Sequence, residues 1–309
     1  MRTRYAIMFA SLVAAGGCKK GGGGPGGGGG GGWLVGEAGL MVNLHGEDRV
    51  GDYDLGATEQ LNAIACRYAG EAWVAGEHGT LLYTSDGGEE WTAQVVPTTA
   101  HLRTIATQDD GPVFIGGDGT FLVTTDTGET WTNLGDGTAS FRSMSAAFAN
   151  SGVLAISEDG GFWQYGDGTL QRRTTLPGAR AIHQTPAGDI VMTAGRGIMR
   201  SINGGATWQP LAVDPSIVFD DLRVNEDGSG VAVGANGAIA NIDVHGGVTL
   251  QYVGTASLHT IHVHHDTTGY AAGDDGTVLV TDDSGLTWRL GPNVGRTVRG
   301  VDEIGFGHR

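Results

Sequence analysis

The sequence predicts an all-β protein, a seven-bladed β-propeller, and two repeated patterns support that prediction. A Gly-centred motif occurs seven times in 309 residues, at spacings of 40, 40, 41, 37, 40 and 39 residues. Its glycines are Gly39, Gly79, Gly119, Gly160, Gly197, Gly237 and Gly276. Each copy offers about four short apolar stretches that are separated by Gly, Asp and Asn turns, without helical periodicity. Repeats of about 40 residues with four strands each are typical of propeller blades.

The second pattern is an apolar stretch before each Gly motif, which we interpret as the inner strand of a blade. These stretches begin at Leu61, Leu102, Phe141, Ala179, Phe219, Leu258 and Val298. The last stretch has no Gly motif after it, and the first Gly motif has no inner strand before it. We therefore expect Val298–Ile304 to pair with Trp33–Gly36, so that both ends of the domain build one blade. Such closure removes the open sheet edges that promote aggregation.

Another motif follows the Gly motif in four of the seven copies and has the form Thr/Ser-x-Asp/Asn-x-Gly-x-x-Trp. The Asp or Asn and the Trp are Asp86 and Trp91, Asp126 and Trp131, Asn203 and Trp208, and Asp283 and Trp288. The acidic or amide side chain can accept hydrogen bonds from turn amides, and Gly supplies a positive φ. The Trp buries a large ring against the neighbouring blade. This motif resembles the Asp-box of bacterial neuraminidase-type repeats, and we expect its residues to be structural.

The N-terminal segment is predicted to be an export signal. Residues 1–17 combine two early arginines with an apolar stretch and small residues directly before Cys18. This order resembles a bacterial lipoprotein signal, in which Cys18 becomes the lipidated first residue of the mature chain. Lys19 at the next position favours the outer membrane, on the periplasmic or surface side. The alternative is an ordinary signal peptide with a chance cysteine. Residues 18–32 are then a Gly-rich linker, and residues 33–309 form the propeller.

The charge of the predicted propeller excludes some partners. Residues 33–309 contain 14 Arg, no Lys and 34 acidic residues, which gives a net charge of −20. Binding to nucleic acid needs clustered positive charge, so we exclude it. Anionic lipid headgroups would repel such a surface, and we expect membrane contact through the lipid anchor only.

The second position of the inner strands is the best candidate binding site. It holds Arg103, Arg142, Arg180 and Arg299, and His259, Asn62 and Asp220 in the other copies. Equivalent positions in a propeller form a ring, so these side chains should surround one mouth of the central channel. A basic ring would concentrate positive potential for an acidic partner group, such as a carboxylate. The alternative is that each Arg pairs with an acidic residue of the next blade.

Together, the seven Gly motifs, the Asp-boxes and inner strands of the type Leu102-Arg103-Thr104-Ile105 resemble the photosystem II stability and assembly-factor family. The resemblance covers about residues 33–307. It implies a non-catalytic propeller that holds membrane-protein partners during assembly. We expect a monomer without a cofactor, whose partner is an envelope protein or a membrane-protein assembly intermediate. The resemblance also implies that the Arg-rich positions above contact that partner.

Two other functions remain open from the residues alone. The Asp-boxes also occur in carbohydrate-binding propellers and in sialidase-like glycoside hydrolases. Hydrolysis needs a carboxylate pair, or Tyr with Glu, beside arginines. The repeat positions of the tyrosines in the domain place none of them beside a Glu at the channel mouth. The sequence indicates no metal site, although His262 and His264 share one strand face and are weak candidates for metal binding.

Overall fold

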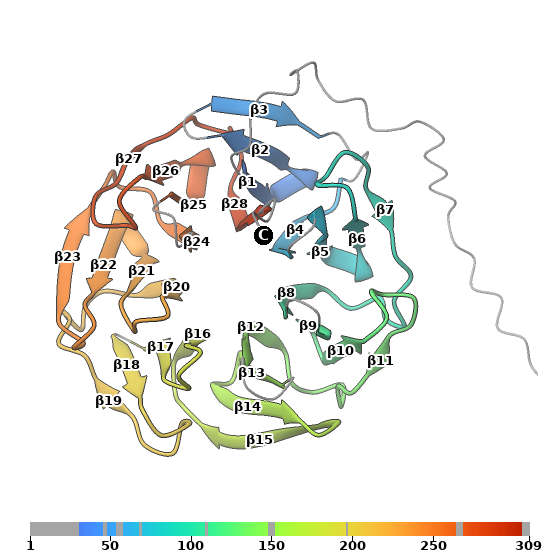
Figure 1. Ribbon diagram of the computed structural model, residues 1–309, viewed down its shortest axis with the longest axis horizontal. Helices are drawn as coiled ribbons and strands as arrows, with labels where there is room; N and C mark the ends of the chain where they lie inside the picture. Colours follow the sequence, from blue (N-terminus) through green and yellow to red (C-terminus); the bar gives the residue numbers. More distant parts are fainter. Residues whose placement is uncertain are drawn as a thin grey trace, which may run out of the picture.

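The computed structural model describes residues 31–45, 48–53, 58–67, 70–108, 111–147, 152–195, 197–263 and 268–304. Within these residues, 28 strands form seven four-stranded antiparallel sheets that stand around a central axis (Figure 1). The predicted seven-bladed propeller is therefore confirmed. The predicted signal peptide, Cys18 and most of the Gly-rich linker lie outside the described residues, as does His264.

Each blade is described from its innermost to its outermost strand. Blade 1 contains β28 (Val298–Ile304), β1 (Gly31–Gly36), β2 (Met41–His45) and β3 (Asp48–Asp52). Blade 2 contains β4 (Leu61–Cys66), β5 (Ala72–Gly76), β6 (Leu81–Thr84) and β7 (Thr92–Ala93). Blade 3 contains β8 (Leu102–Thr107), β9 (Val113–Gly117), β10 (Thr120–Thr124) and β11 (Thr132–Asn133). Blade 4 contains β12 (Phe141–Ala147), β13 (Gly152–Ser157), β14 (Gly161–Gly166) and β15 (Thr169–Thr175).

The remaining blades follow the same plan. Blade 5 contains β16 (Ala179–Gln184), β17 (Ile190–Ala194), β18 (Ile198–Ser201) and β19 (Gln209–Pro210). Blade 6 contains β20 (Phe219–Val224), β21 (Gly230–Gly234), β22 (Ala238–Ile242) and β23 (Val248–Tyr252). Blade 7 contains β24 (Leu258–Val263), β25 (Gly269–Gly273), β26 (Val278–Thr281) and β27 (Arg289–Leu290). Each inner strand thus follows the outermost strand of the preceding blade.

Blade 1 closes the ring with both ends of the domain, as predicted. The C-terminal strand β28 lies innermost, beside the axis, and pairs antiparallel with β1, for example Leu34 with Val301 (Figure 1). Strand β1 begins at Gly31, two residues before the predicted start of the domain. Gly32 therefore belongs to a strand, and a Cβ there would collide with the ring of Tyr270 from blade 7.

The Gly motifs form tight turns between the second and third strands of the blades. In blade 2 the amide of Thr80 donates to the carbonyl of Glu77 at 2.9 Å, and φ is positive at His78 (55°) and Gly79 (73°). Two central residues with positive φ define a type I′ turn, the turn that suits the twist of a β-hairpin. Short 3-10 segments mark such turns at η1 (Glu37–Gly39), η3 (Glu77–Gly79), η4 (Ala235–Gly237) and η5 (Asp274–Gly276).

The four segments with the predicted Asp-box pattern connect the third and fourth strands of blades 2, 3, 5 and 7. In blade 2 Thr84 Oγ1 donates to Asp86 at 2.6 Å, and Asp86 accepts from the amide of Glu90 at 3.1 Å. Gly88 has a φ of 87°, and a Cβ there would collide with Trp33 of blade 1. Trp91 meets that same ring edge-on, with centroids 5.6 Å apart. The box therefore satisfies its own turn amides while its Gly and Trp pack on the preceding blade.

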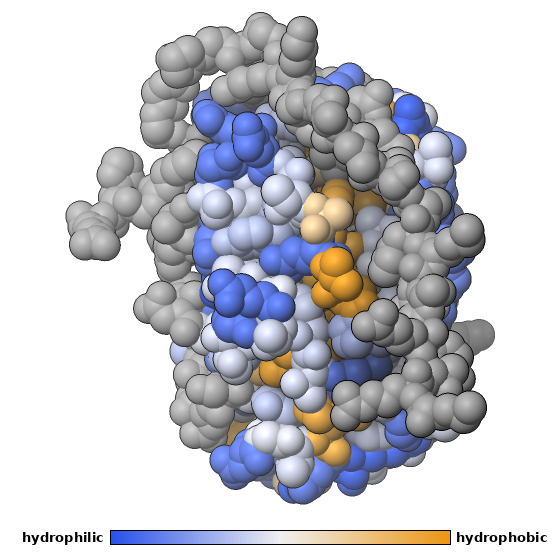
Figure 2. Space-filling view, turned by 90° about the vertical axis from the view of Figure 1, so that its right-hand side faces the viewer, coloured by the Kyte–Doolittle hydropathy of each residue, from blue (hydrophilic) through white to orange (hydrophobic). Residues whose placement is uncertain are grey.

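The hydrophobic core lies between neighbouring blades. Its side chains are almost completely buried, as in Trp73, Phe114, Phe121, Phe141 and Phe219. The outer surface over the blades that carry β7 and β11 is mainly hydrophilic, with small separate apolar areas (Figure 2). No helix in the described part of the chain is long and apolar enough to span a membrane.

Candidate functional site

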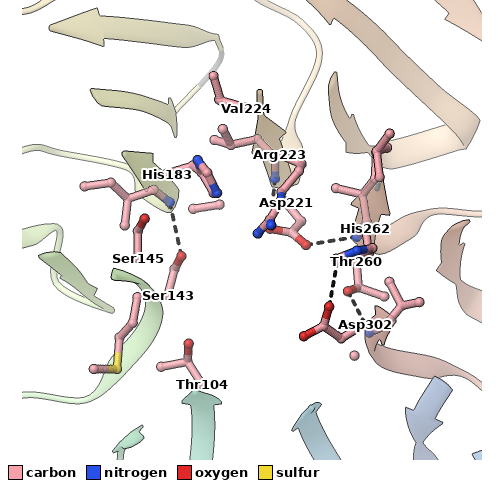
Figure 3. A pocket seen from close by; sticks show the side chains of 18 of the residues that line it. Thr104, Ser143, Ser145, His183, Asp221, Arg223, Val224, Thr260, His262 and Asp302 are labelled. Carbon is pink, nitrogen blue, oxygen red and sulfur yellow. Dashed lines mark hydrogen bonds and ion pairs between the residues drawn. The ribbon is translucent and has the colours of Figure 1, made fainter. Parts of the chain in front are cut away.

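The inner strands surround a channel of about 1360 Å³ that is lined mainly by polar side chains. Polar residues are frequent at the third and fifth positions of these strands (Figure 3). They are Thr104, Ser143, Asp221 and Thr260 at the third position, and Ser145, His183, Arg223, His262 and Asp302 at the fifth. Apart from His262, the predictions from sequence did not identify these interior residues, although a comparison of alternate positions in the repeats would have shown them.

Several interior side chains satisfy backbone amides of the next blade. Ser143 accepts from the amide of Ile182 at 3.1 Å, and Thr260 accepts from the amide of Val301 at 3.2 Å. Asp302 accepts from the amide of Cys66 at 2.7 Å. The channel-facing edge of an inner strand has no neighbouring strand, so its N–H groups need side-chain or solvent partners. These polar residues therefore connect the inner strands into a ring.

Charged groups occur in the same interior layer. His262 Nδ1 lies 2.7 Å from Asp302, so this candidate metal ligand is held by a carboxylate. Burial raises the pKa of Asp302, but His262 and the Cys66 amide outweigh burial and hold it below the usual range. Burial, together with the positive charges of Arg223 and His262, holds the pKa of His183 well below its usual value. Burial raises the pKa of Asp221 to about 6, despite hydrogen bonds from two backbone amides.

The predicted arginines surround one end of this channel. Arg103, Arg142, Arg180 and Arg299 all line the cavity, together with Asn62, Asp220 and His259 from the remaining blades. Each of these residues lies at a shift of the register between the first and second strands of its blade. In blade 3, for example, Leu102 pairs with Gly117 and Thr104 with Gly116, which leaves Arg103 as the extra residue of a β-bulge. A bulge redirects a side chain away from its ordinary face, and here it presents the residue to the channel mouth.

Three of the four arginines bind carboxylates of their own blade. Arg103 Nε lies 2.6 Å from Asp118, Arg142 Nη1 lies 3.3 Å from Glu158, and Arg299 Nη2 lies 3.4 Å from Glu37. These acidic residues belong to the Gly-motif turns. The alternative that each Arg pairs with the next blade holds only in blade 5, where Arg180 Nη1 lies 2.8 Å from Asp220 of blade 6.

The mouth is therefore a ring of ion pairs, and the expected excess of positive charge is not found among the described residues. His259 completes this arrangement, because its Nδ1 lies 3.3 Å from Asp220 and its Nε2 lies 2.7 Å from Asp274. The bond to Asp220 is the main reason that the pKa of His259 rises. Five carboxylates thus face the four arginines and one histidine. Four of them belong to the Gly-motif turns beside the bulges, and the fifth, Asp220, belongs to an inner strand.

The arginines of blades 3, 4 and 5 form a continuous arc. The side chain of Arg142, which is 25% exposed, lies between Arg103 and Arg180. Burial is the main reason that the pKa of Arg142 falls, and the positive charges of both neighbours contribute. We name Arg103, Arg142 and Arg180 the arginine arc.

Comparisons with known proteins place this geometry in a context. No protein-family model matches the chain. The chain is 25% identical over 211 residues to the photosystem II assembly lipoprotein Ycf48 of Synechococcus sp. (strain CC9902), covering 63% of this chain and 62% of that protein's length. This chain is similar to Ycf48. The resemblance indicated by the repeats is therefore confirmed in sequence.

Solved structures of Ycf48 have the same fold. The structure of Ycf48 bound to a D1 peptide superimposes with a TM-score of 0.60 at 20% identity, covering 74% of this chain and 80% of that chain. Ycf48 from Cyanidioschyzon merolae gives a TM-score of 0.61 at 17% identity, covering 77% and 87% of the two chains. At these identities the structural comparisons support the propeller fold alone.

A Tyr–Glu pair of the kind that sialidases need does exist, but it lies away from the arginine arc. Tyr83 donates to Glu71 at 2.9 Å, and neither residue lines the channel. Burial and this bond raise the pKa of Tyr83 to about 12, which makes the phenol a poorer nucleophile. Arg67 nearby donates to the carbonyl of Gly111 and stacks over Trp73.

The raised pKa of Asp221 gives a test of the channel interior. A folded-state pKa of about 6, above the ordinary value of 3.8, means that its contribution to stability is full below pH ~4 and declines as pH rises through about 6. The variant Asp221→Asn keeps an oxygen that can accept from Ile261. It should be about 1–2 kcal/mol more stable than the wild type at pH 8. A pKa shift of about two units corresponds to roughly 3 kcal/mol, and solvent screening lowers this value. At pH 4 the difference should vanish.

Urea unfolding at pH 8 and pH 4 measures both free energies. The variant Asp221→Ala is the control, because it loses the acceptor for Ile261 and should be less stable at both pH values. If Asp221→Asn is instead less stable than the wild type at pH 8, the folded protein stabilises the ionised carboxylate rather than disfavouring it, and this interpretation is wrong.

Proposed function

We propose that this chain is a non-catalytic binding scaffold of the cell envelope that captures a segment of a membrane protein at the channel mouth. The observation that carries the proposal is the arginine arc on a propeller similar to Ycf48. One solved structure of Ycf48 holds a D1 peptide, which supports a peptide as the class of ligand. We do not propose D1 itself as the partner of this chain.

The recognition mechanism follows from the ion pairs. A guanidinium has five N–H donors, and a carboxylate of the partner can bind the donors that the turn carboxylates leave unused. Among the contacts of the described residues, Arg142 reaches Glu158 through Nη1 only, and its carboxylate partner is 46% exposed. Exposed ion pairs contribute only about 0–1 kcal/mol, so exchanging one carboxylate for another costs little. Binding therefore occurs when a carboxylate of the partner replaces a turn carboxylate at a guanidinium, which we call carboxylate exchange. It does not depend on attraction to a ring of unpaired positive charges.

The surrounding charge makes this recognition selective. The domain carries a net charge of −20, so an acidic chain is repelled except where its carboxylates meet the arc. The polar channel below the arc has room for a chain end or side chains, with a volume of about 1360 Å³. The ligand that fits best is therefore a short segment with a few acidic groups, such as a C-terminal carboxylate.

We also propose that Cys18 is lipidated and holds a monomeric propeller at the outer membrane. Ycf48 of Synechococcus is named a lipoprotein, which supports this proposal together with the signal-like order of residues 1–17. Cells grown with an alkynyl fatty acid should label the wild-type chain, and the variant Cys18→Ser should lose the label. Equal labelling of the variant would contradict lipidation at Cys18.

The arginine arc can be tested by crosslinking in cells. A photo-crosslinking amino acid at Asn62, on the mouth, should form an adduct with a membrane-protein segment that mass spectrometry identifies. The same amino acid at Thr169, on the exposed outer strand β15, should not. Changing Arg103, Arg142 and Arg180 to Gln should reduce the mouth adduct by at least about tenfold, because the donors for the partner carboxylate are lost.

The matched control changes Arg172, Arg173 and Arg289 to Gln, which alters the net charge equally on outer strands. This control should keep the adduct. An adduct that survives loss of the arc, or that depends equally on the outer arginines, would contradict the proposed site. Crosslinking to a glycan instead of a protein would favour the carbohydrate-binding alternative.

A further inference from the structure

A cluster of two histidines and a glutamate lies on the rim of the channel mouth, between blades 2 and 3. Glu77, His78 and His101 each offer one ligand atom, and these three atoms all lie within 4.8 Å of one another. From this geometry we propose that the cluster is a binding site for a divalent transition-metal ion, with Zn²⁺ as the representative. The proposal does not depend on the identity of the protein partner.

The fold brings His101 to Glu77 and His78, which lie more than 20 positions earlier in the chain. The Gly-motif turn of blade 2 packs against the entry to β8, where the amide of Gly79 donates to the carbonyl of Ala100 at 2.8 Å. The positive φ of His78 places its side chain on this side of the turn, and its ring lies 4.9 Å from the ring of His101. The amide of His78 donates to His101 Nδ1 at 3.4 Å, a long contact that a metal bound through Nδ1 would replace.

The donor set suits a borderline metal. Imidazole nitrogens with a carboxylate oxygen are typical ligands for Zn²⁺, Cu²⁺ and Ni²⁺. Three protein ligands leave at least one coordination position for water or for another ligand.

Glu59 strengthens this assignment as a positioning residue. It lies 2.9 Å from Nδ1 of His78, and when that nitrogen donates to Glu59 the lone pair of Nε2 is available to a metal. A metal-binding His in proteins almost always has such a partner for its second nitrogen, which fixes the tautomer and the ring orientation. The side chains of His78 and Glu59 are 65% and 42% exposed, so an ion can enter from solvent.

The local charge favours a cation. Glu59 and Glu77 contribute negative charge beside the two histidines. Arg103 is the nearby positive group, and its own charge is balanced by the 2.6 Å contact with Asp118. A metal at this cluster would lie near the first residue of the arginine arc, because Glu77 is close enough to Arg103 to interact with it electrostatically.

Zinc titration of the full chain by calorimetry tests the site. Wild-type protein should bind Zn²⁺. The double variant His78→Asn with His101→Gln should bind at least about tenfold more weakly, since loss of a residue that only positions a ligand already costs about 10–100-fold in metal affinity. Asn is chosen because Asn236 occupies the equivalent turn position of blade 6 at a φ of 56°, so the turn can form. Zn²⁺ should also raise the thermal unfolding temperature of the wild type, but not of the double variant.

The control is His245→Asn, which removes an exposed histidine of blade 6. It should bind Zn²⁺ as the wild type does. The variant Glu59→Gln should weaken binding and leave the stoichiometry unchanged. Zinc affinity and stoichiometry that are the same in the double variant as in the wild type would place the metal elsewhere, and no detectable wild-type binding would also overturn the proposal.

Discussion

The structure depends on one constraint: seven inner strands converge on one axis, and their channel-facing edges cannot pair with another strand. Their amides therefore need side-chain or solvent partners. Ser143, Asp221, Thr260 and Asp302 are such partners, because they accept hydrogen bonds from the following blade. Because an unpaired buried N–H costs about 1–3 kcal/mol, this ring of side chains is a condition for closing the propeller rather than a feature added for binding.

The same constraint shapes the channel mouth. Where each inner strand begins, a β-bulge leaves one residue without a partner in the second strand, and its side chain turns toward the axis. The Gly-motif turns of the same blades lie beside these bulges and supply Asp118, Glu158 and Glu37. An arginine at a bulge therefore meets a turn carboxylate before it meets a ligand. This pairing orders the guanidiniums that we propose for carboxylate exchange.

Much of the fold could be predicted from the sequence because its signals are local. A positive φ at each Gly-motif turn requires Gly within a short distance, so residues such as Gly79 and Gly276 mark the blades. Closure of the ring by Val298–Ile304 could be predicted because the last inner strand has no Gly motif after it, and the first Gly motif has no inner strand before it. The ring of Arg103, Arg142, Arg180 and Arg299 was likewise predicted by repeat position.

The ion pairs and the rim cluster could not be predicted in this way. Whether Arg103 meets Asp118 of its own turn or an acid of the next blade depends on a one-residue bulge, which the sequence pattern does not reveal. His78 and His101 come together because a turn of one blade packs on the entry to the next. His262, a metal candidate by strand alternation, instead contacts Asp302 of the adjacent strand across the blade boundary.

The most direct test of carboxylate exchange removes the competing carboxylates and leaves the arginines intact. The double variant Asp118→Asn with Glu158→Gln would be compared with Asp282→Asn with Glu129→Gln, an equal change of charge away from the mouth. Calorimetry would measure the affinity of each for the acidic segment identified by crosslinking. Our account predicts tighter binding by the mouth variant than by its control. Binding that is weaker than the control, or equal to it, would show that the turn carboxylates do not compete with the ligand and would contradict the account.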